Sequence, residues 1–392
     1  MVDLASWVLR VVYFYGHLIG VSNFEFDWRT GRVFAAKWTT FYAIAINSTM
    51  FILYSYHWIG ITNMMNLFFG KANKLHEYVV IIMTGIKIVA GLVTVLNRWR
   101  QRCQMMDLAR NVIQLFLNCP QLKKISRLGV LVKFFTGVVT DFLQVIITLD
   151  ALGRVDPQYY LGISLQYWMS AILNLATSQH YLIVLFIRSH YQILNVELRQ
   201  VIEESKELSR NPPGQGVFMT RCCFLADQLE DIAKIQSQLQ SIMNQLEEVF
   251  GLQGMMVQSG YYMSMVATAY LTYSVLRNGY EAMQMTFRGV ILTSAWCFFY
   301  YFDVMLNLVV MLFVLDEHKK LLLLLEERTL FAPGLDVRLE QSFESFQLQV
   351  THNPLKIDVV KMYEINRSSS MSMFASFIMH SIYLIQYDLE NF

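Results

Sequence analysis

The sequence predicts an all-α membrane protein with seven transmembrane helices. Of its 392 residues, 55% are hydrophobic and only 16% are charged, whereas about a quarter of the residues in soluble domains are charged. Seven stretches are long and apolar enough to cross a bilayer as helices. These stretches are residues 38–60, 78–96, 128–149, 161–187, 251–276, 290–315 and 369–387.

The connections between these stretches differ in their content of Lys and Arg. The leader and the second, fourth and sixth connections are rich in both residue types. The opposite side holds only Lys71, Lys74, Arg154, Arg277 and Arg288. Because basic residues concentrate on the cytoplasmic side, we expect a cytoplasmic N-terminus and an extracellular C-terminus. No cysteine lies in a predicted extracellular connection, so no extracellular disulfide is expected.

The spans divide the chain into six predicted regions. A cytoplasmic leader (1–37) precedes helices 1–4 (38–187), and a cytoplasmic amphipathic linker (188–250) precedes helices 5 and 6 (251–315). A cytoplasmic loop and anchor (316–368) leads to helix 7 with its extracellular tail (369–392).

The linker carries one apolar stripe at steps of three and four residues, which is typical of an amphipathic helix. Pro212, Pro213 and Gly214 break the helix before it. We expect spans four to six to extend below the membrane as an anchor bundle that joins subunits. The alternative is a helix on the bilayer surface, although the acidic residues of the linker suit anionic lipid poorly. The stripe consists of Leu225, Leu229, Ile232, Ile235, Leu239, Ile242, Leu246 and Val249.

Four charged residues fall inside predicted spans, where charges are rare and usually face protein or water. Lys87 and Asp141 both lie ~12–14 Å below the outer surface, at ~1.5 Å per residue. They form either a buried ion pair between two helices or part of a polar ligand pocket. Lys133 is close enough to the inner surface to extend its amine to water. Asp303 lies deeper and has no evident partner in the sequence.

The outer halves of several spans are rich in aromatic side chains, which favours a pocket for a small, largely apolar ligand. The alternative for each ring is packing, or a place in the aromatic belt at the membrane surface. The candidate ligand-binding residues are Lys87, Asp141, Tyr167, Trp168, Tyr270, Tyr273, Trp296 and Tyr300.

The last span carries no charge over residues 371–387 but contains Gln386 near its end. A polar group in a membrane helix faces protein or water more readily than lipid. We therefore expect this helix to line a pore together with copies from neighbouring subunits. No enzyme motif, metal-ligand spacing or basic nucleic-acid motif is present. No catalytic activity, cofactor, metal or nucleic-acid partner is expected.

Motifs near the end of the chain carry a family resemblance. In the last span, Met379-His380 precedes five residues (381–385) and then Gln386-Tyr387. This arrangement resembles the C-terminal signature of insect gustatory receptors, in which Thr-Tyr, five apolar residues and Gln-Phe follow one another. The departures resemble the divergent bitter-type receptors of flies. The stretch before that span reads Phe346-Gln347-Leu348-Gln349, His352-Asn353-Pro354-Leu355 and Tyr363-Glu364-Ile365-Asn366-Arg367.

The resemblance implies a ligand-gated cation channel in the plasma membrane of sensory neurons, opened by a small-molecule tastant. It implies a tetramer of one or several subunit types, surrounded by lipid, with Gln386 and Tyr387 at the gate. Ile382 and Ile385 are the apolar neighbours, and one of them can share the face of Gln386.

Asp388 and Glu390 follow the gate directly, and we expect them to ring the outer mouth and concentrate cations. Solvated tail residues are the alternative for both. A non-conducting receptor or scaffold and a small-molecule transporter remain alternative functions for the whole chain.

Overall fold

The computed structural model describes residues 4–27, 30, 32–58, 74–153, 157, 160–279, 286–329 and 335–391. This part of the chain is almost entirely helical. Its helices are α1 (Leu4–Ile19), α2 (Lys37–Trp58), α4 (Lys74–Arg100), α5 (Arg102–Asn118), α6 (Pro120–Leu152), α7 (Tyr160–Arg210), α8 (Gln215–Asn278), α9 (Phe287–Thr329), α10 (Val337–His352) and α11 (Arg367–Asn391). Two antiparallel hairpins pair β1 (Glu25–Phe26) with β2 (Val33–Phe34) and β3 (Asp358–Val359) with β4 (Tyr363–Glu364).

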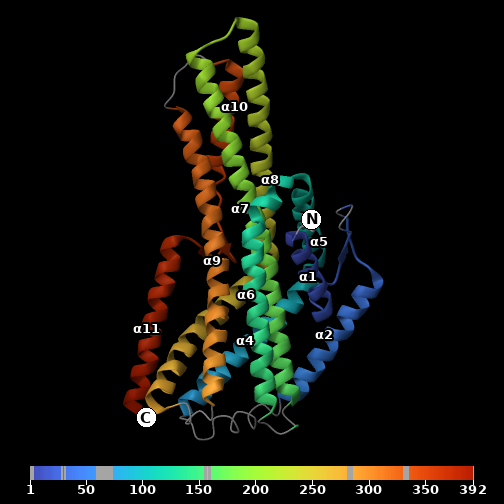
Figure 1. Ribbon diagram of the computed structural model, residues 1–392, viewed down its shortest axis with the longest axis vertical. Coiled ribbons are helices and arrows are strands. Elements are labelled where there is room, and N and C mark those ends of the chain that lie inside the picture. The colour runs from blue at the N-terminus through green and yellow to red at the C-terminus, as the bar shows by residue number, and fades with distance from the viewer. Residues whose placement is uncertain are drawn as a thin grey trace.

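Three helices are far longer than a membrane is thick. Helix α7 has 51 residues, α8 has 64 and α9 has 43. At ~1.5 Å per residue, α8 is ~96 Å long. Figure 1 shows these helices converging with α10 into a bundle at one end of an elongated molecule. Helices α7, α8 and α9 continue well past the stretches that the sequence predicts to span, and α7 and α8 are separated at the Pro212-Pro213-Gly214 break.

The bundle has an apolar core because the predicted stripe of α8 faces inward. Leu229 and Leu239 are fully buried, and Phe343 and Phe346 of α10 pack into the same cluster. The side-chain amide of Gln349 adds a hydrogen bond to the carbonyl of Ala233, at 3.1 Å. Burial of this stripe by neighbouring helices excludes a helix lying freely on the bilayer surface.

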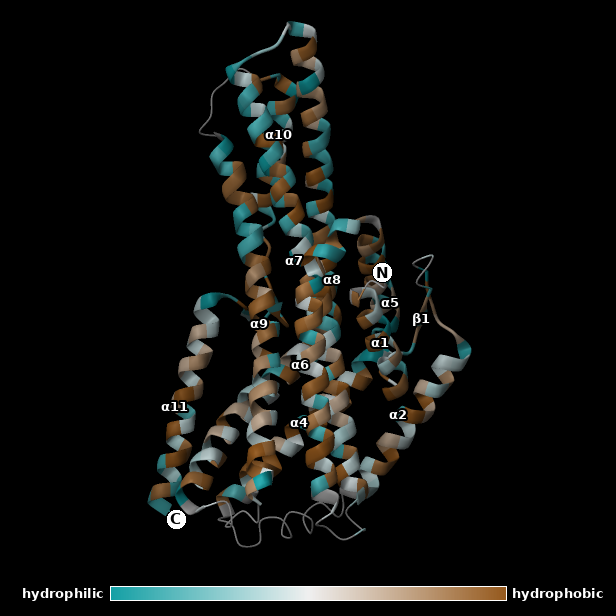
Figure 2. Ribbon diagram, in the orientation of Figure 1, coloured by the Kyte–Doolittle hydropathy of each residue, from teal (hydrophilic) through white to brown (hydrophobic). Residues whose placement is uncertain are grey.

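Within the described part of the chain, four helical segments are long and apolar enough to cross a membrane by length and composition. They are Tyr78–Arg100, Pro120–Asp150, Tyr160–Arg210 and Phe287–Arg328. The predicted spans also fall on α2, α8 and α11, whose polar residues dilute their apolar character. The first predicted span reaches residue 60, and its last two residues lie outside the described part. Figure 2 shows hydrophilic colour gathered over the α7–α10 end and mainly brown and white below it.

Helix α11 begins with a cap that its own sequence provides. The side chain of Asn366 accepts a hydrogen bond from the backbone N–H of Ser369 at 2.8 Å, and the Ser369 hydroxyl accepts one from the backbone N–H of Asn366 at 3.0 Å. This reciprocal arrangement satisfies donors that a helix start leaves free. From this cap α11 descends along the edge of the molecule and packs against α8 (Figure 1).

Candidate ligand site and pore helix

The first group of candidate residues forms an aromatic site with a cation between α4 and α9. The ammonium of Lys87 lies 5.9 Å from the centroid of the Trp296 ring. Trp296 in turn stacks on Tyr300, with centroids 4.8 Å apart and an interplanar angle of 18°. A cation over an indole face is attracted by the electron density of the ring.

This site retains an unused donor. The indole Nε1 of Trp296 is buried and has no hydrogen-bond partner among the described residues. Buried polar atoms normally have partners, so this N–H is available to an acceptor on a bound molecule. Tyr300 also meets Tyr261 of α8 edge-on, at 5.4 Å. The site therefore offers flat aromatic surfaces, one positive charge and one directed donor.

Asp141 lies in a different environment. Its carboxylate accepts hydrogen bonds from Tyr15 of α1 at 3.1 Å and from Asn174 of α7 at 2.9 Å. Among the described residues it forms no ion pair with Lys87. The neighbouring candidates Tyr167 and Trp168 are half-buried on α7. Trp168 packs against the cluster that includes Leu165 and Ile88.

The ion pair inside the membrane region joins other residues. The ammonium of Lys133 lies 2.5 Å from one carboxylate oxygen of Asp303, and Thr136 donates to the other at 2.7 Å. The prediction that Lys133 extends to the inner surface is therefore wrong, and Asp303, for which the sequence showed no evident partner, is paired with Lys133. Helices α6 and α9 pack side by side although they are far apart in the sequence, which brings the two charges together.

Tyr270 belongs to a third group, near the C-terminal end of α8. It is fully buried, and its hydroxyl donates to Asp388 of α11 at 3.0 Å. Nδ1 of His76 lies 3.3 Å from the same hydroxyl, and Arg277 reaches the other oxygen of Asp388 at 3.3 Å. Tyr273 lies one turn further along α8 and is half-buried. Tyr270 thus contacts the last helix rather than the Lys87–Trp296 site.

Helix α11 has two distinct faces. Ser381 and Asp388 are buried against the protomer, and Ile385 packs beside Tyr270 on the same side. On the other side, Gln386 is exposed with Ile382, one turn earlier. Ile382 is therefore the apolar neighbour that shares the face of Gln386. Tyr387 and Glu390 are also exposed, whereas Asp388 is enclosed by side chains of α8.

Comparison with known proteins identifies the family. Residues 9–391 match the family described as "7tm Chemosensory receptor". The chain is 58% identical over 390 residues to putative gustatory receptor 36c of Drosophila melanogaster, with 100% of both chains covered. This chain belongs to the insect gustatory receptor family. Putative gustatory receptors 36b and 36a of the same species are 50% and 49% identical, again over 100% of both chains.

The gustatory receptor fold also resembles solved structures. The insect olfactory receptor OR5 from Machilis hrabei matches with a TM-score of 0.69, covering 98% of both chains at 14% sequence identity. Its complex with eugenol matches with a TM-score of 0.64 at 13% identity, over 97% of this chain and 98% of that one. The chain is thus a multi-pass membrane chemoreceptor. The resemblance inferred from the C-terminal motifs is confirmed, as is the prediction that the chain is not an enzyme.

The sequence reasoning missed the residues that complete the three groups. Tyr15 and Asn174 around Asp141, and His76 and Arg277 around Asp388, come from other helices. One signal was present for Arg277: it ends the fifth predicted span on the same side of the membrane as Asp388. Opposite charges at matching depths are a reason to test for a pair. Nothing in the sequence pointed to Tyr15, which lies in the leader.

Proposed function

We propose that this gustatory receptor is a ligand-gated cation channel in the plasma membrane of sensory neurons, opened by a small, bitter-type tastant. In this proposal seven helices cross the membrane, with a cytoplasmic N-terminus and an extracellular C-terminus. Four subunits, identical or mixed, surround a pore lined by α11. The α7–α10 bundle joins them on the cytoplasmic side.

The observation that carries this proposal is the two-faced packing of α11. One face is held by α8, and the other leaves Gln386 exposed near the end of a stretch, residues 371–387, that carries no charge. An amide that faces lipid lacks hydrogen-bond partners, whereas water or a second α11 supplies them. Assembly around an axis places Gln386 and Ile382 toward the centre, where a polar ring next to an apolar ring can form a gate.

The Lys87–Trp296–Tyr300 site is the proposed tastant site. Its chemistry favours a flat, largely apolar molecule that carries a hydrogen-bond acceptor. Tyr300 contacts Tyr261 of α8, and α8 holds α11 through Tyr270 nine residues further on. That separation is ~13.5 Å along one helix. A ligand that binds more tightly when α9 and α8 shift would favour the open state through this connection.

Recording currents from cells that express the chain, alone and with related receptors, tests the proposal. Gln386→Ala is expected to change ion selectivity or resting current, because it removes the polar ring of the gate. Gln104→Ala, which removes an exposed amide on α5 far from α11, is the matched control and should leave both unchanged. Unchanged selectivity and resting current in Gln386→Ala would remove this residue from the gate. Saturable binding of a tastant without current from any subunit combination would favour a non-conducting receptor.

A further inference from the structure

Basic side chains from three helices gather around one pocket, which is lined by α7, α9 and α11. The pocket has a volume of about 380 Å³, which is within the range of small-ligand sites. Among the described residues, four of the six charged side chains that line it are basic. The six are Arg188 of α7, Asp316, Glu317, Lys319 and Lys320 of α9, and Arg367, the first residue of α11.

Both acidic side chains of this pocket already have basic partners. A carboxylate oxygen of Asp316 lies 2.6 Å from a guanidinium nitrogen of Arg367, and one of Glu317 lies 3.0 Å from the ammonium of Lys320. Each acid thus neutralises one base. The two remaining bases leave the described lining of the pocket with an excess of two positive charges.

The two remaining bases are Arg188 and Lys319, and neither forms an ion pair or a hydrogen bond with a described residue. The guanidinium carbon of Arg188 lies 4.3 Å from the centroid of the Phe313 ring, which attracts the charge but supplies no anion. Lys319 is exposed. Because like charges that share a pocket repel one another, both bases favour an anion in it.

The pocket lies at the level where three predicted spans end. Arg188 directly follows the fourth span, Asp316 directly follows the sixth, and Arg367 precedes the last by two residues. On α9, Phe302 and Phe313 are 44% and 40% exposed. Their separation is about three turns, so both lie on one side of α9, ~16.5 Å apart, which is close to half the thickness of the hydrocarbon core. An apolar path therefore leads from the pocket into the membrane.

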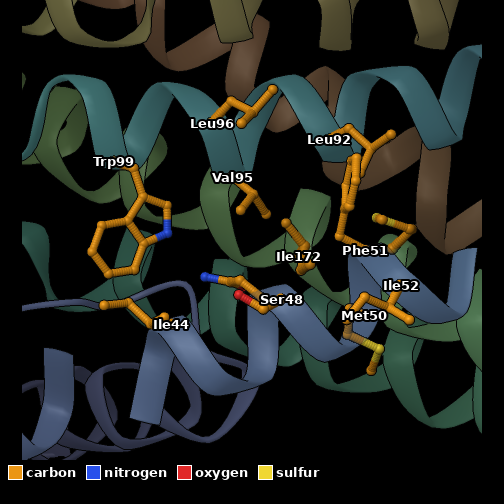
Figure 3. A pocket seen from close by; sticks show the side chains of 12 residues that line it. Ile44, Ser48, Met50, Phe51, Ile52, Leu92, Val95, Leu96, Trp99 and Ile172 are labelled. Atoms are coloured by element: carbon orange, nitrogen blue, oxygen red, sulfur yellow. The ribbon is translucent and has the colours of Figure 1, made fainter. Parts of the chain in front are cut away.

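A second groove of similar size lacks the charges of this pocket. It lies between α2, α4 and α7 and has a volume of about 310 Å³. Figure 3 shows its walls, with Leu92 and Val95 of α4 facing Ile44 and Ser48 of α2. No charged side chain of a described residue lines this groove, so it has nothing that would select an anion. The excess of positive charge is what distinguishes the pocket beside α11.

We propose that the pocket beside α11 binds one phospholipid whose headgroup carries a phosphomonoester, with the phosphate at Arg188 and Lys319 and an acyl chain beside Phe313. A phosphomonoester carries about −1.5 to −2 charges at neutral pH, which matches the two unpaired bases. The proposed orientation places the pocket at the cytoplasmic leaflet, and basic pockets between helices on that side bind phosphoinositide headgroups. Only this choice of leaflet rests on the proposed function.

Native mass spectrometry of the delipidated protein tests this site without any current measurement, so its outcome is independent of the proposed channel. The probes are phosphatidylinositol 4-phosphate and phosphatidylinositol with identical acyl chains, which differ only in the phosphomonoester. The wild-type protein is expected to bind phosphatidylinositol 4-phosphate about tenfold more tightly, the factor that corresponds to about 1.4 kcal/mol. Equal affinity of the wild-type protein for the two lipids overturns the proposal.

Substitutions inside and outside the pocket locate the site. Lys319→Gln, at an exposed position, should reduce the preference, and Arg188→Gln/Lys319→Gln should abolish it. The controls are Arg199→Gln, an exposed position further along α7, and Ser48→Phe in the groove of Figure 3, and both should retain the preference. An unchanged preference in the variants of the pocket overturns the proposal. If the double variant does not fold, Lys319→Gln decides, because its side chain is exposed and unpaired among the described residues.

A soluble probe separates a lipid from a free phosphate ester. Inositol 1,4-bisphosphate, which has the phosphates of the headgroup without acyl chains, should not displace the lipid at equal concentration, because it lacks the apolar contact with α9. Phe302→Gln should weaken binding of both lipids for the same reason. Full displacement by inositol 1,4-bisphosphate, or undiminished lipid binding by Phe302→Gln, would mean that the acyl chain contributes nothing and would overturn a lipid as the occupant.

Discussion

The hydroxyl of Tyr270 donates a 3.0 Å hydrogen bond to the carboxylate of Asp388 and so joins α8 to the C-terminal end of α11. Asp388 is almost completely buried, and Arg277 contacts its second oxygen. A buried carboxylate depends on such donors, since an unsatisfied charged group is costly. This contact holds the last helix in the position that the structure shows.

Tyr270→Phe is expected to weaken that attachment. Loss of the donor should destabilise the observed position of α11 by about 1–3 kcal/mol and change the resting current, because α11 lines the proposed pore. Whole-cell current without tastant is the measurement, and Tyr273→Phe, one turn away and half-buried, is the control. Equal resting currents in wild type and Tyr270→Phe would show that this bond does not restrain α11.

The buried Lys133–Asp303 pair predicts that loss of one charge destabilises the protein more than loss of both charges. Lys133→Met leaves the Asp303 carboxylate buried without its cation and should lower the free energy of unfolding by about 3–5 kcal/mol. The double variant Lys133→Met/Asp303→Leu should lose less, because both charges are gone. Thermal unfolding in detergent compares them, with Lys124→Met at an exposed position as control. A double variant less stable than Lys133→Met would contradict this account.

Glu247 of α8 predicts that the stability of the protein depends on pH. The pKa of Glu247 is raised to about 7, with burial as the largest cause; a hydrogen bond from the Asp358 backbone N–H acts to lower the pKa, and the Asp358 charge acts to raise it. The residue lines a cavity of about 90 Å³ with Gln253 and Asn307. Because the folded protein holds this proton more tightly than the unfolded chain, the stabilisation is present at low pH and is lost as pH rises through about 7.

Glu247→Gln should therefore reduce the fall in melting temperature between pH 5.5 and pH 8. The difference is of the order of 1 kcal/mol, smaller than the full shift implies, because solvent screens a partly exposed group. Glu248→Gln, at the adjacent position, is the control. Parallel melting curves for wild type and Glu247→Gln across this pH range would count against the raised pKa.

The β3–β4 hairpin that precedes α11 predicts a stabilising substitution. Val360 and Lys361 both adopt left-handed backbone conformations, with φ of 54° and 56°. The backbone N–H of Met362 closes the turn on the carbonyl of Val359 at 2.9 Å. Such turns favour Asn and Gly, and a β-branched side chain at positive φ is strained. Val360→Asn/Lys361→Gly should raise the free energy of unfolding by about 1–2 kcal/mol, as measured by thermal unfolding.

An unchanged or lower melting temperature in this hairpin variant would mean that the side chain of Val360 contributes more than its strain costs. Val360 lies near Gly251 of α8, where a Cβ would be 3.8 Å from its Cγ2 atom. Lys361→Gly alone separates these two effects, because it relieves the strain at position 361 and keeps the side chain of Val360.

Local sequence patterns predicted where most helices lie along the chain, but they did not predict which helices pack against one another. The apolar stripe through Leu229 and Leu239 runs on into the fifth span, which requires one continuous helix. By contrast, the partner of Asp303 depends on α6 packing beside α9, and no periodicity within either helix specifies that. For the same reason, the sequence did not indicate that Lys87 lies beside Trp296 and does not pair with Asp141.

Helix α11 also shows which features the sequence revealed and which it did not. The sequence shows the uncharged stretch of α11 and the position of Gln386. Because both sides of this helix are apolar, the sequence does not show which side faces the rest of the protomer. The structure resolves the choice within one protomer by burying Ser381 and Ile385 against α8. The same orientation of α11 determines the environment of Asp388, because Asp388 lies one turn beyond Ile385 and therefore contacts Tyr270.

Because α8 is one continuous helix, a tilt of the helix moves both of its ends. Its 64 residues carry the core of the bundle at one end and Tyr270 near the other. If it pivots about its middle by about 5°, each end of a ~96 Å rod swings by about 4 Å, in opposite directions. Pulling on the end of α8 that lies in the α7–α10 bundle would then displace the contact between Tyr270 and α11 at the other end, so a mechanical force on the bundle would act on the last helix.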